Sequence, residues 1–249
     1  MSRSELFTYS GTRILARHGR RPGEADWERL ERVADFGHFL QNARETGLEP
    51  FVRHLAGSAD AHEVERSLRG AWATYIDEVA GWQPAPWRPA ARWLAVLAEL
   101  PPLAHLRAGD ASHRWMERLP ALGPAIESGD GLRPRLLARG RLGPVVAEDA
   151  PAEPLEAWLR HWHHLLPAGP GRFLPPLEEL AGHLRTYRAA VADGDGDAEE
   201  TLERRLVRTL RRHGREPAGA YAHLGLVALD VQRLRRDLLL RRLLPEQAA

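Results

Sequence analysis

The sequence predicts an all-α protein, on the strength of three observations. Apolar residues recur three and four positions apart in nearly every segment, as they do on one face of a helix. The breaks between segments fall at Gly and Pro, which end helices. No stretch shows the period-two alternation of a half-buried strand, and Val145-Val146 is the nearest approach to one. We therefore expect many helices and no central sheet.

Four helices are predicted in the first half of the chain. Asp60 is placed to cap the third helix, with Glu63 in the capping-box position. A rigid corner follows, because three prolines fix the backbone and remove hydrogen-bond donors. In order, the predicted segments are a helix over 5–17, a helix over 26–44, the helix from Asp60 with Val64, Leu68, Trp72, Tyr75, Ile76 and Val79 on one face, the corner at 81–89, and a helix over 90–100 that ends at Pro101-Pro102.

A Pro- and Gly-rich connection at 119–151 separates this half from a second helical half. We therefore predict two helical subdomains, 1–118 and 152–249. The helices expected in the second subdomain cover 153–166, 174–191, 198–213 and 218–244.

The two predicted subdomains also resemble each other. Val64-Glu65-Arg66-Ser67-Leu68 follows Asp60, and Leu202-Glu203-Arg204-Arg205-Leu206 follows Asp197. An internal repeat predicts this similarity, and common helix patterning predicts it equally well.

Composition excludes several classes of protein. The 249 residues are 43% hydrophobic and 28% charged, as in an ordinary globular chain, and the net charge of +1 favours neither nucleic acid nor an anionic membrane. All 35 basic residues are Arg, and Cys is absent, which excludes disulfides and thiolate metal sites and suits a reducing cytoplasm. There is no signal-peptide pattern and no apolar run of roughly 20 residues. We expect a cytoplasmic protein without direct membrane insertion.

The stretch RILARHGRRP resembles the Arg-His-Gly-x-Arg-x-Pro motif of histidine phosphatases. Arg17, His18, Gly19, Arg21 and Pro22 come within one residue of that pattern. The phosphatase hypothesis makes His18 the nucleophile and the two arginines clamps for phosphate oxygens. That fold requires a parallel sheet, which the sequence does not predict. A basic helix end, stopped by Gly and Pro, is the favoured interpretation.

Two other patterns resemble metal sites. His161 and His164 lie three residues apart on one predicted helix, a spacing that can bind a metal, although zinc requires further ligands. Asp193, Asp195 and Asp197 alternate like the start of a calcium loop, but Ala198 and Arg204 stand where an EF-hand requires Gly and Glu. Packing histidines and a solvated loop are the favoured interpretations. We expect no metal and no other cofactor.

The order of the helical segments resembles the family formed by the C subunit of archaeal-type rotary ATPases and the d subunit of the vacuolar ATPase. The residues that carry the resemblance are Tyr9, Arg13 and Arg17 in the first helix, Arg44-Glu45-Thr46-Gly47-Leu48 with Pro50-Phe51, Glu65 to Leu68, Trp82 to Pro84, and Asp230-Val231-Gln232-Arg233-Leu234-Arg235. The chain departs from the family by being shorter, by carrying Arg233 in place of an Asn, and by Pro101-Pro102 where the family continues a helix.

The resemblance implies a non-catalytic coupling protein that seats the central stalk on the membrane rotor ring. Its partners would be rotor-ring and stalk subunits, and it would lie peripheral to the inner face of the membrane through that complex. We expect six arginines on the first and last helices to serve in docking, since Arg is favoured in interface ion pairs. These residues are Arg13, Arg17, Arg233, Arg236, Arg241 and Arg242. A helical interaction module of unrelated origin remains an alternative.

Overall fold

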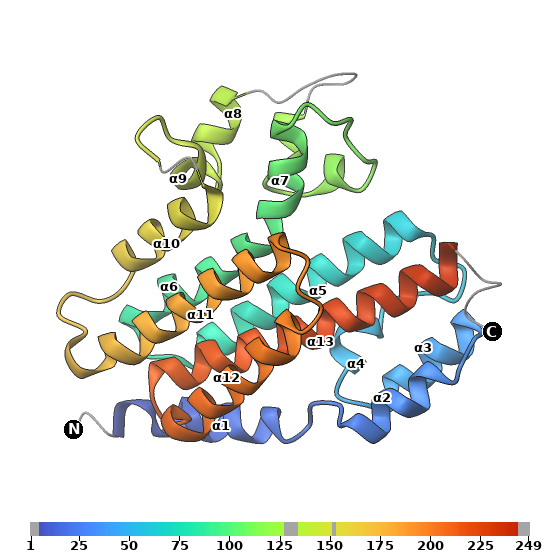
Figure 1. The fold of residues 1–249 in the computed structure, drawn as a ribbon, viewed down its shortest axis with the longest axis horizontal. Coiled ribbons are helices and arrows are strands. Elements are labelled where there is room, and N and C mark those ends of the chain that lie inside the picture. Colours follow the sequence, from blue (N-terminus) through green and yellow to red (C-terminus); the bar gives the residue numbers. More distant parts are fainter. Residues whose placement is uncertain (1–4, 127–133, 151–152, 244–249) are drawn as a thin grey trace. The chain divides into compact units, whose positions relative to one another are not determined.

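The computed structural model describes residues 5–126, 134–150 and 153–243, and these residues form helices and no strand (Figure 1). The predicted all-α class is confirmed. The α-helices are α1 (Thr8–His18), α2 (Glu24–Glu31), α3 (Phe36–Arg44), α4 (Glu49–Val52), α5 (Ala61–Trp82), α6 (Arg88–Trp93), α7 (Leu100–Arg107), α8 (Pro134–Arg139), α9 (Gly143–Val146), α10 (Pro154–His164), α11 (Leu174–Ala192), α12 (Ala198–His213) and α13 (Pro217–Leu243). The 3-10 helices are η1 (Glu5–Phe7), η2 (Ala85–Trp87), η3 (Leu94–Glu99), η4 (Met116–Arg118), η5 (Gly123–Ala125) and η6 (Gly171–Phe173).

Contacts between the helices divide the chain into two compact units. The first unit joins residues 1–88 to 167–249, and the second consists of residues 89–166. These boundaries differ from the sequence-based subdomains 1–118 and 152–249, because the two ends of the chain pack together around α13.

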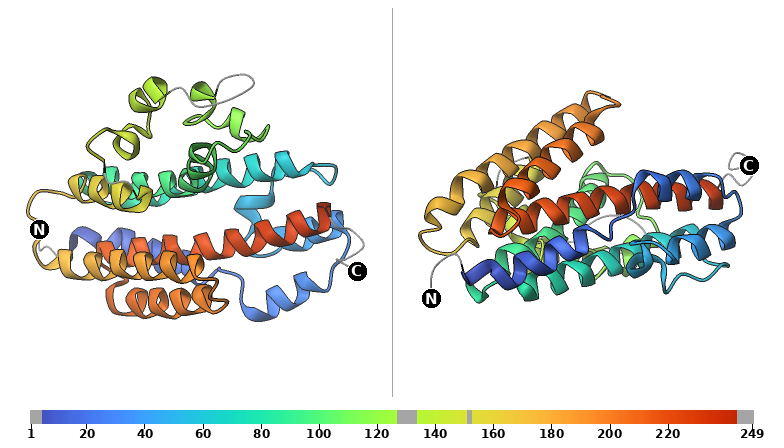
Figure 2. Two further views of the ribbon diagram at one scale, coloured as in Figure 1. Left: turned by 45° about the horizontal axis from the view of Figure 1, so that its top comes forward. Right: turned by 90° about the horizontal axis from the view of Figure 1, so that it is seen from below.

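Helix α13 is the centre of the first unit. It contacts α1, α5, α11 and α12, and both views in Figure 2 show α5 and α12 alongside it. Its first eight residues, 217–224, are all buried, so this part of the helix is enclosed on every side. Small residues make this packing close: a Cβ on Gly225 would lie 2.9 Å from Leu206 Cδ1. The two similar stretches of sequence lie near the starts of α5 and α12, and both of these helices contact α13.

The predicted cap at Asp60 is confirmed. Its side chain accepts a hydrogen bond from the Glu63 amide at 2.7 Å, and the Glu63 carboxylate accepts one from the Asp60 amide at 3.0 Å. This reciprocal pair satisfies two amides that a helix start would otherwise leave free.

The single helix predicted over 26–44 is wrong, because two helices, α2 and α3, replace it. The break falls where Asp35 caps α3 by accepting a hydrogen bond from the His38 amide at 2.8 Å. The carbonyls freed at the end of α2 accept hydrogen bonds from Arg241, as Leu30 does at 3.2 Å and Val33 does at 2.7 Å. A side chain about 200 residues away thus satisfies the helix end.

Two further expectations are wrong. Pro101 and Pro102 do not stop a helix but occupy the first turn of α7, where the missing amide hydrogens cost nothing. The predicted helix over 90–100 is instead η3 following α6. Val145 and Val146, the nearest approach to a strand pattern in the sequence, lie in the short helix α9, which agrees with the prediction of no strand.

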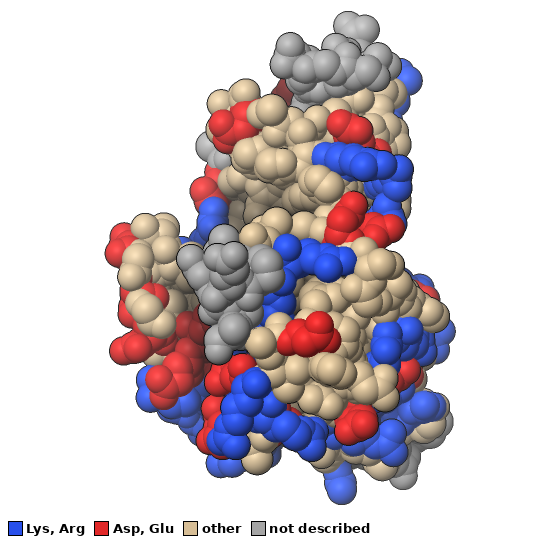
Figure 3. All heavy atoms as spheres, turned by 90° about the vertical axis from the view of Figure 1, so that its right-hand side faces the viewer, with Lys and Arg blue, Asp and Glu red and all other residues tan. Residues whose placement is uncertain are grey.

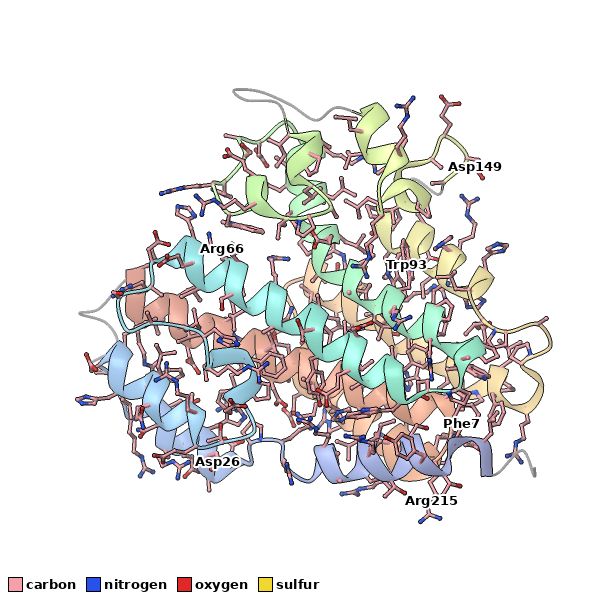
Figure 4. All side chains as sticks on the ribbon, turned by 180° about the vertical axis from the view of Figure 1, so that it is seen from behind. Phe7, Asp26, Arg66, Trp93, Asp149 and Arg215 are labelled. Atoms are coloured by element: carbon pink, nitrogen blue, oxygen red, sulfur yellow. The ribbon has the colours of Figure 1, made fainter. Side chains whose placement is uncertain are left out.

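Paired tryptophans hold the core of the second unit. The indole of Trp93, labelled in Figure 4, donates to the Trp158 carbonyl at 3.1 Å, and the Trp158 indole donates to the Trp93 carbonyl at 3.2 Å. The two rings stack with centroids 6.4 Å apart, and Trp162 also stacks on Trp158. All three tryptophans are buried, so their rings serve packing within this unit.

Candidate functional site

A polar pocket of about 190 Å³ lies where α1 ends in the first unit. Helix α1 stops at His18, and residues 19–23 then cross between the α3–α4 turn and α13. The basic motif of the sequence and part of the Arg-Glu-Thr-Gly stretch therefore meet in one place. The residues that line the pocket are Arg17, Arg20, Arg21, Pro22, Thr46, Gly47, Leu48, Glu49, Pro50, Phe51, Tyr75, Val227 and Asp230.

Arg21 and Asp230 form the central ion pair of this pocket. The Arg21 Nε donates to Oδ2 of Asp230 at 2.6 Å and its Nη2 donates to Oδ1 at 2.8 Å, a bidentate geometry. The same guanidinium donates to Glu203 Oε1 at 3.3 Å and to the carbonyl of Leu226 at 3.3 Å. Burial raises the pKa of Asp230, and the hydrogen bonds from Arg21 oppose that rise. Acceptors within the chain thus engage both Nε and Nη2 of the guanidinium.

Gly47 fixes the backbone that crosses the pocket. A Cβ at this position would lie 1.9 Å from the carbonyl oxygen of Arg20, which no side chain can approach. The α3–α4 turn therefore lies in close contact with the backbone after α1, including that of Arg21.

Two histidines lie next to the ion pair. The Tyr75 hydroxyl and His223 Nε2 are 2.8 Å apart and buried, and the His18 ring meets the His223 ring edge-on at 6.3 Å. Burial lowers the pKa of His223 to about 3, with smaller contributions in the same direction from His18, Arg21 and Arg17. The pKa of His18 is also lowered, chiefly by burial. Both imidazoles are therefore neutral near pH 7.

This arrangement gives the phosphatase hypothesis no support. Arg21 is engaged by Asp230, and Arg17 Nη2 donates to Glu78 Oε1 at 2.6 Å, so carboxylates of the chain itself occupy both proposed clamps. The described residues also lack the strands that this fold requires. These ion pairs instead connect α1 and the segment after it to α5 and α13.

The predicted docking arginines of the first helix have partners within the first unit. Arg13 is exposed and donates to the Tyr9 hydroxyl at 2.6 Å, while its guanidinium lies 4.8 Å from the centroid of Trp82. Arg17 lies 5.8 Å from the same indole. Tyr9 and Arg13 thus form an exposed surface supported by a buried tryptophan.

The arginines of α13 bind other parts of the first unit. Arg233 lies 4.5 Å from the Trp27 ring centroid and donates to Glu31 at 2.6 Å, while Arg236 makes a bidentate pair with Glu199. Arg242 donates to the carbonyls of Ala59 and Gly57.

Arg241 is only 6% exposed, so its side chain is buried within the first unit. Its guanidinium lies 4.2 Å from the Phe39 ring centroid and donates to the carbonyls at the end of α2. The C-terminal arginines therefore hold helices of this chain together.

The two suspected metal patterns lie elsewhere and gather no ligand set within the described part of the chain. The His161 ring packs edge-on against the Trp93 ring, with centroids 4.5 Å apart. The centroids of the His161 and His164 rings are 6.2 Å apart. Asp195 accepts a hydrogen bond from the Asp197 amide at 2.9 Å in an exposed loop, and the Asp197 side chain makes no cap bond to α12. Among the residues that the structure describes, no group of three His, Cys, Asp or Glu could hold a metal ion.

Sequence reasoning missed the two pairs of residues that meet in and beside the pocket. Tyr75 and His223 are 148 residues apart, and Arg21 and Asp230 are 209 apart, so local spacing does not pair them. The signal that could have found them was the placement of polar residues on otherwise apolar helix faces.

Comparison with known proteins gave no match to a family model, to a curated protein or to a solved structure. None of the helices in the described part of the chain combines the length and the apolar character of a membrane span. On the face shown in Figure 3, arginines and acidic side chains are interspersed.

Proposed function

We propose that this chain is a non-catalytic coupling protein related to the subunit that seats the central stalk of a rotary ATPase on its rotor ring. A coupling subunit transmits force through a body whose helices are fixed to one another. It needs surface complementarity to its partners rather than an acid–base site.

The observation that carries the proposal is that the stretches with the resemblance contact one another. Arg13 and Arg17 of the first stretch lie against Trp82. Gly47 packs on the backbone after α1. Glu65, at the start of α5, is paired with Arg235 of the last stretch, which also carries Asp230, the partner of Arg21. All these stretches lie in the first unit, so they form part of one packed body, which suits a coupling subunit.

Helix α1 offers the surface for partner binding. Tyr9 is 60% exposed beside Arg13, and Leu6 and Leu15 are 43% and 41% exposed along the same helix and its entry. Aromatic and arginine side chains are enriched at interfaces because they combine apolar area with directed hydrogen bonds. We therefore assign docking to Tyr9 and Arg13, and internal bracing to the α13 arginines.

The experiment is an affinity purification of the tagged chain from its native membranes in mild detergent, with mass spectrometry of the co-purified proteins. We expect rotor-ring and central-stalk subunits in stoichiometric amounts. The double variant Tyr9→Ala, Arg13→Glu should lose them, and the exposed control Arg32→Glu should keep them. Recovery of an assembly without ATPase subunits, or of no partner, would overturn the proposal.

A further inference from the structure

A second and larger cleft, of about 330 Å³, lies at the start of the chain in the first unit. Its walls come from η1 and α1, from η6, and from the turn that joins α12 to α13. Phe7 and Arg215, both labelled in Figure 4, mark two of these walls. The polar pocket around Arg21 shares no lining residue with it among the residues that the structure describes.

The floor of this cleft is a rigid cluster of aromatic rings that are themselves buried, with Phe7 1% and Phe173 8% exposed. Phe7 meets Phe173 at 5.3 Å and Trp87 at 5.6 Å, both edge-to-face, and Trp87 meets Phe173 at 5.8 Å. Three rings packed edge-to-face fix one another in place. Leu15 extends the floor from the cleft toward solvent, since 41% of it is exposed.

The rim of the cleft is strongly basic. Four arginines and His213 surround the floor, and Glu216 is the only acid among the described residues that line it. Glu216 is already shared, since it accepts from His213 Nδ1 at 2.8 Å and lies 3.8 Å from Arg172. The other three arginines are exposed and make no ion pair in the part of the chain that the structure describes. They are Arg211, Arg212 and Arg215.

Arg211 and Arg212 lie at the end of α12 and Arg215 lies in the turn that follows, and this turn is held in place by close backbone contacts. A Cβ on Gly11 of α1 would lie 2.8 Å from Arg215 Cα, and a Cβ on Gly219 would lie 2.4 Å from the His213 carbonyl oxygen. The turn is therefore pressed between α1 and the start of α13. A fixed turn loses little entropy when its side chains bind a ligand.

We propose that this cleft binds an acidic peptide segment of a protein partner, with an apolar side chain of that segment against the exposed Leu15 at the edge of the floor. The guanidiniums of the rim would bind carboxylates in bidentate fashion. The arginines stand exposed around the rim rather than converging on one enclosed point, as a site for a small anion would require. Leu15 gives the cleft an exposed apolar edge beside the arginines, which suits a segment that carries both acidic and apolar side chains.

This inference supplies a partner chemistry for the proposed function and rests on it only for the existence of a protein partner. Its test uses the purified chain and a synthetic probe, so it can fail or succeed independently of the ATPase assignment. The probe is a fluorescein-labelled peptide, Glu-Asp-Glu-Leu-Phe-Glu-Asp-Glu. Two control peptides replace all its acids by Gln and Asn, or its Leu-Phe by Ala-Ala.

Fluorescence anisotropy at low and high salt would measure binding of the probe. We expect saturable binding that weakens steeply with salt, because exposed charge pairs are screened. The double variant Arg211→Ala, Arg215→Ala should weaken it by about tenfold or more, while Arg208→Ala, an exposed arginine of the same helix outside the cleft lining, should leave it within about twofold. Both control peptides should bind more weakly than the probe.

Three results would overturn the proposal. One is absence of saturable binding by a chain whose circular dichroism is native. Another is equal weakening by Arg208→Ala and by the double variant, which would indicate a general charge effect. The third is complete displacement of the probe by inorganic phosphate but not by chloride at matched ionic strength, which would identify a small-anion site instead.

Discussion

The guanidinium of Arg21 makes two hydrogen bonds, of 2.6 and 2.8 Å, to the carboxylate of Asp230, a residue 209 positions further along the chain. The pair joins the segment after α1 to the middle of the central helix. Both side chains are largely buried, with exposed fractions of 12% and 8%. Neither charge can be solvated if its partner is removed, so the pair constrains how the two ends of the chain pack.

Arg21→Ala should therefore destabilise the protein strongly. Removing one partner of a buried ion pair typically costs about 3–5 kcal/mol, because the remaining charge stays buried without compensation. Urea unfolding followed by circular dichroism would measure the loss. Arg32→Ala is the control, since its side chain is 79% exposed and its ion pair with Glu28 is at the surface, where pairs contribute about 0–1 kcal/mol. Equal effects of the two variants would contradict the burial of the pair.

His223 should make the stability depend on pH in the acidic range. Its pKa is about 3 in the folded chain and 6.5 in a model compound. Between these values the unfolded state binds a proton that the folded state does not bind. The free energy of unfolding should thus fall as the pH drops below about 6.5, by roughly 1 kcal/mol for each pH unit.

The variant His223→Phe tests this dependence. It should show a shallower decline of unfolding free energy between pH 6 and pH 4.5 than the wild type, by the equivalent of about one proton. Its absolute stability should also be lower, because the Tyr75 hydroxyl loses its partner. His38→Gln, which changes an imidazole that is 83% exposed, is the control and should keep the wild-type slope. An unchanged slope in His223→Phe would show that His223 is accessible to protons.

Most helices could be predicted from the sequence because their signals are local. Asp60 and Glu63 stand three residues apart, and the apolar stripe from Val64 to Val79 needs only helical periodicity. One error arose where a distant residue decides, because the carbonyls at the end of α2 accept hydrogen bonds from Arg241. The error at Pro101-Pro102 was local, because Pro can follow the end of one helix or occupy the first turn of the next, as it does in α7.

The site was harder to predict for the same reason. The basic stretch was visible, but its chemistry depends on which acids meet it. Arg17 and Arg21 resemble phosphate clamps until Glu78 and Asp230 are placed beside them. Likewise, Arg233 resembles part of a free basic face until Glu31 accepts from it.

Gly47→Ala should destabilise the chain through backbone displacement. The added Cβ would lie 1.9 Å from the Arg20 carbonyl oxygen, so the α3–α4 turn must move away from the segment after α1. We expect a loss of about 1–3 kcal/mol or more, as for other overpacked sites. Gly70→Ala is the matched control, because this glycine lies inside α5 with nothing within 4 Å of an added Cβ. That change should stabilise the chain by up to about 1 kcal/mol. Equal signs for the two variants would contradict the close approach.

The reciprocal hydrogen bonds of Trp93 and Trp158 predict strong coupling in the second unit. Trp93→Phe removes one indole donor and leaves the Trp158 carbonyl without it, and Trp158→Phe does the converse. Each change should cost about 1–3 kcal/mol and weaken the near-ultraviolet circular dichroism of the stacked rings. The double variant should cost less than the two single changes together, because each single change already disturbs the indole-on-indole packing that the two residues share. Strict additivity, measured by urea unfolding of all four proteins, would show that the two indoles act independently.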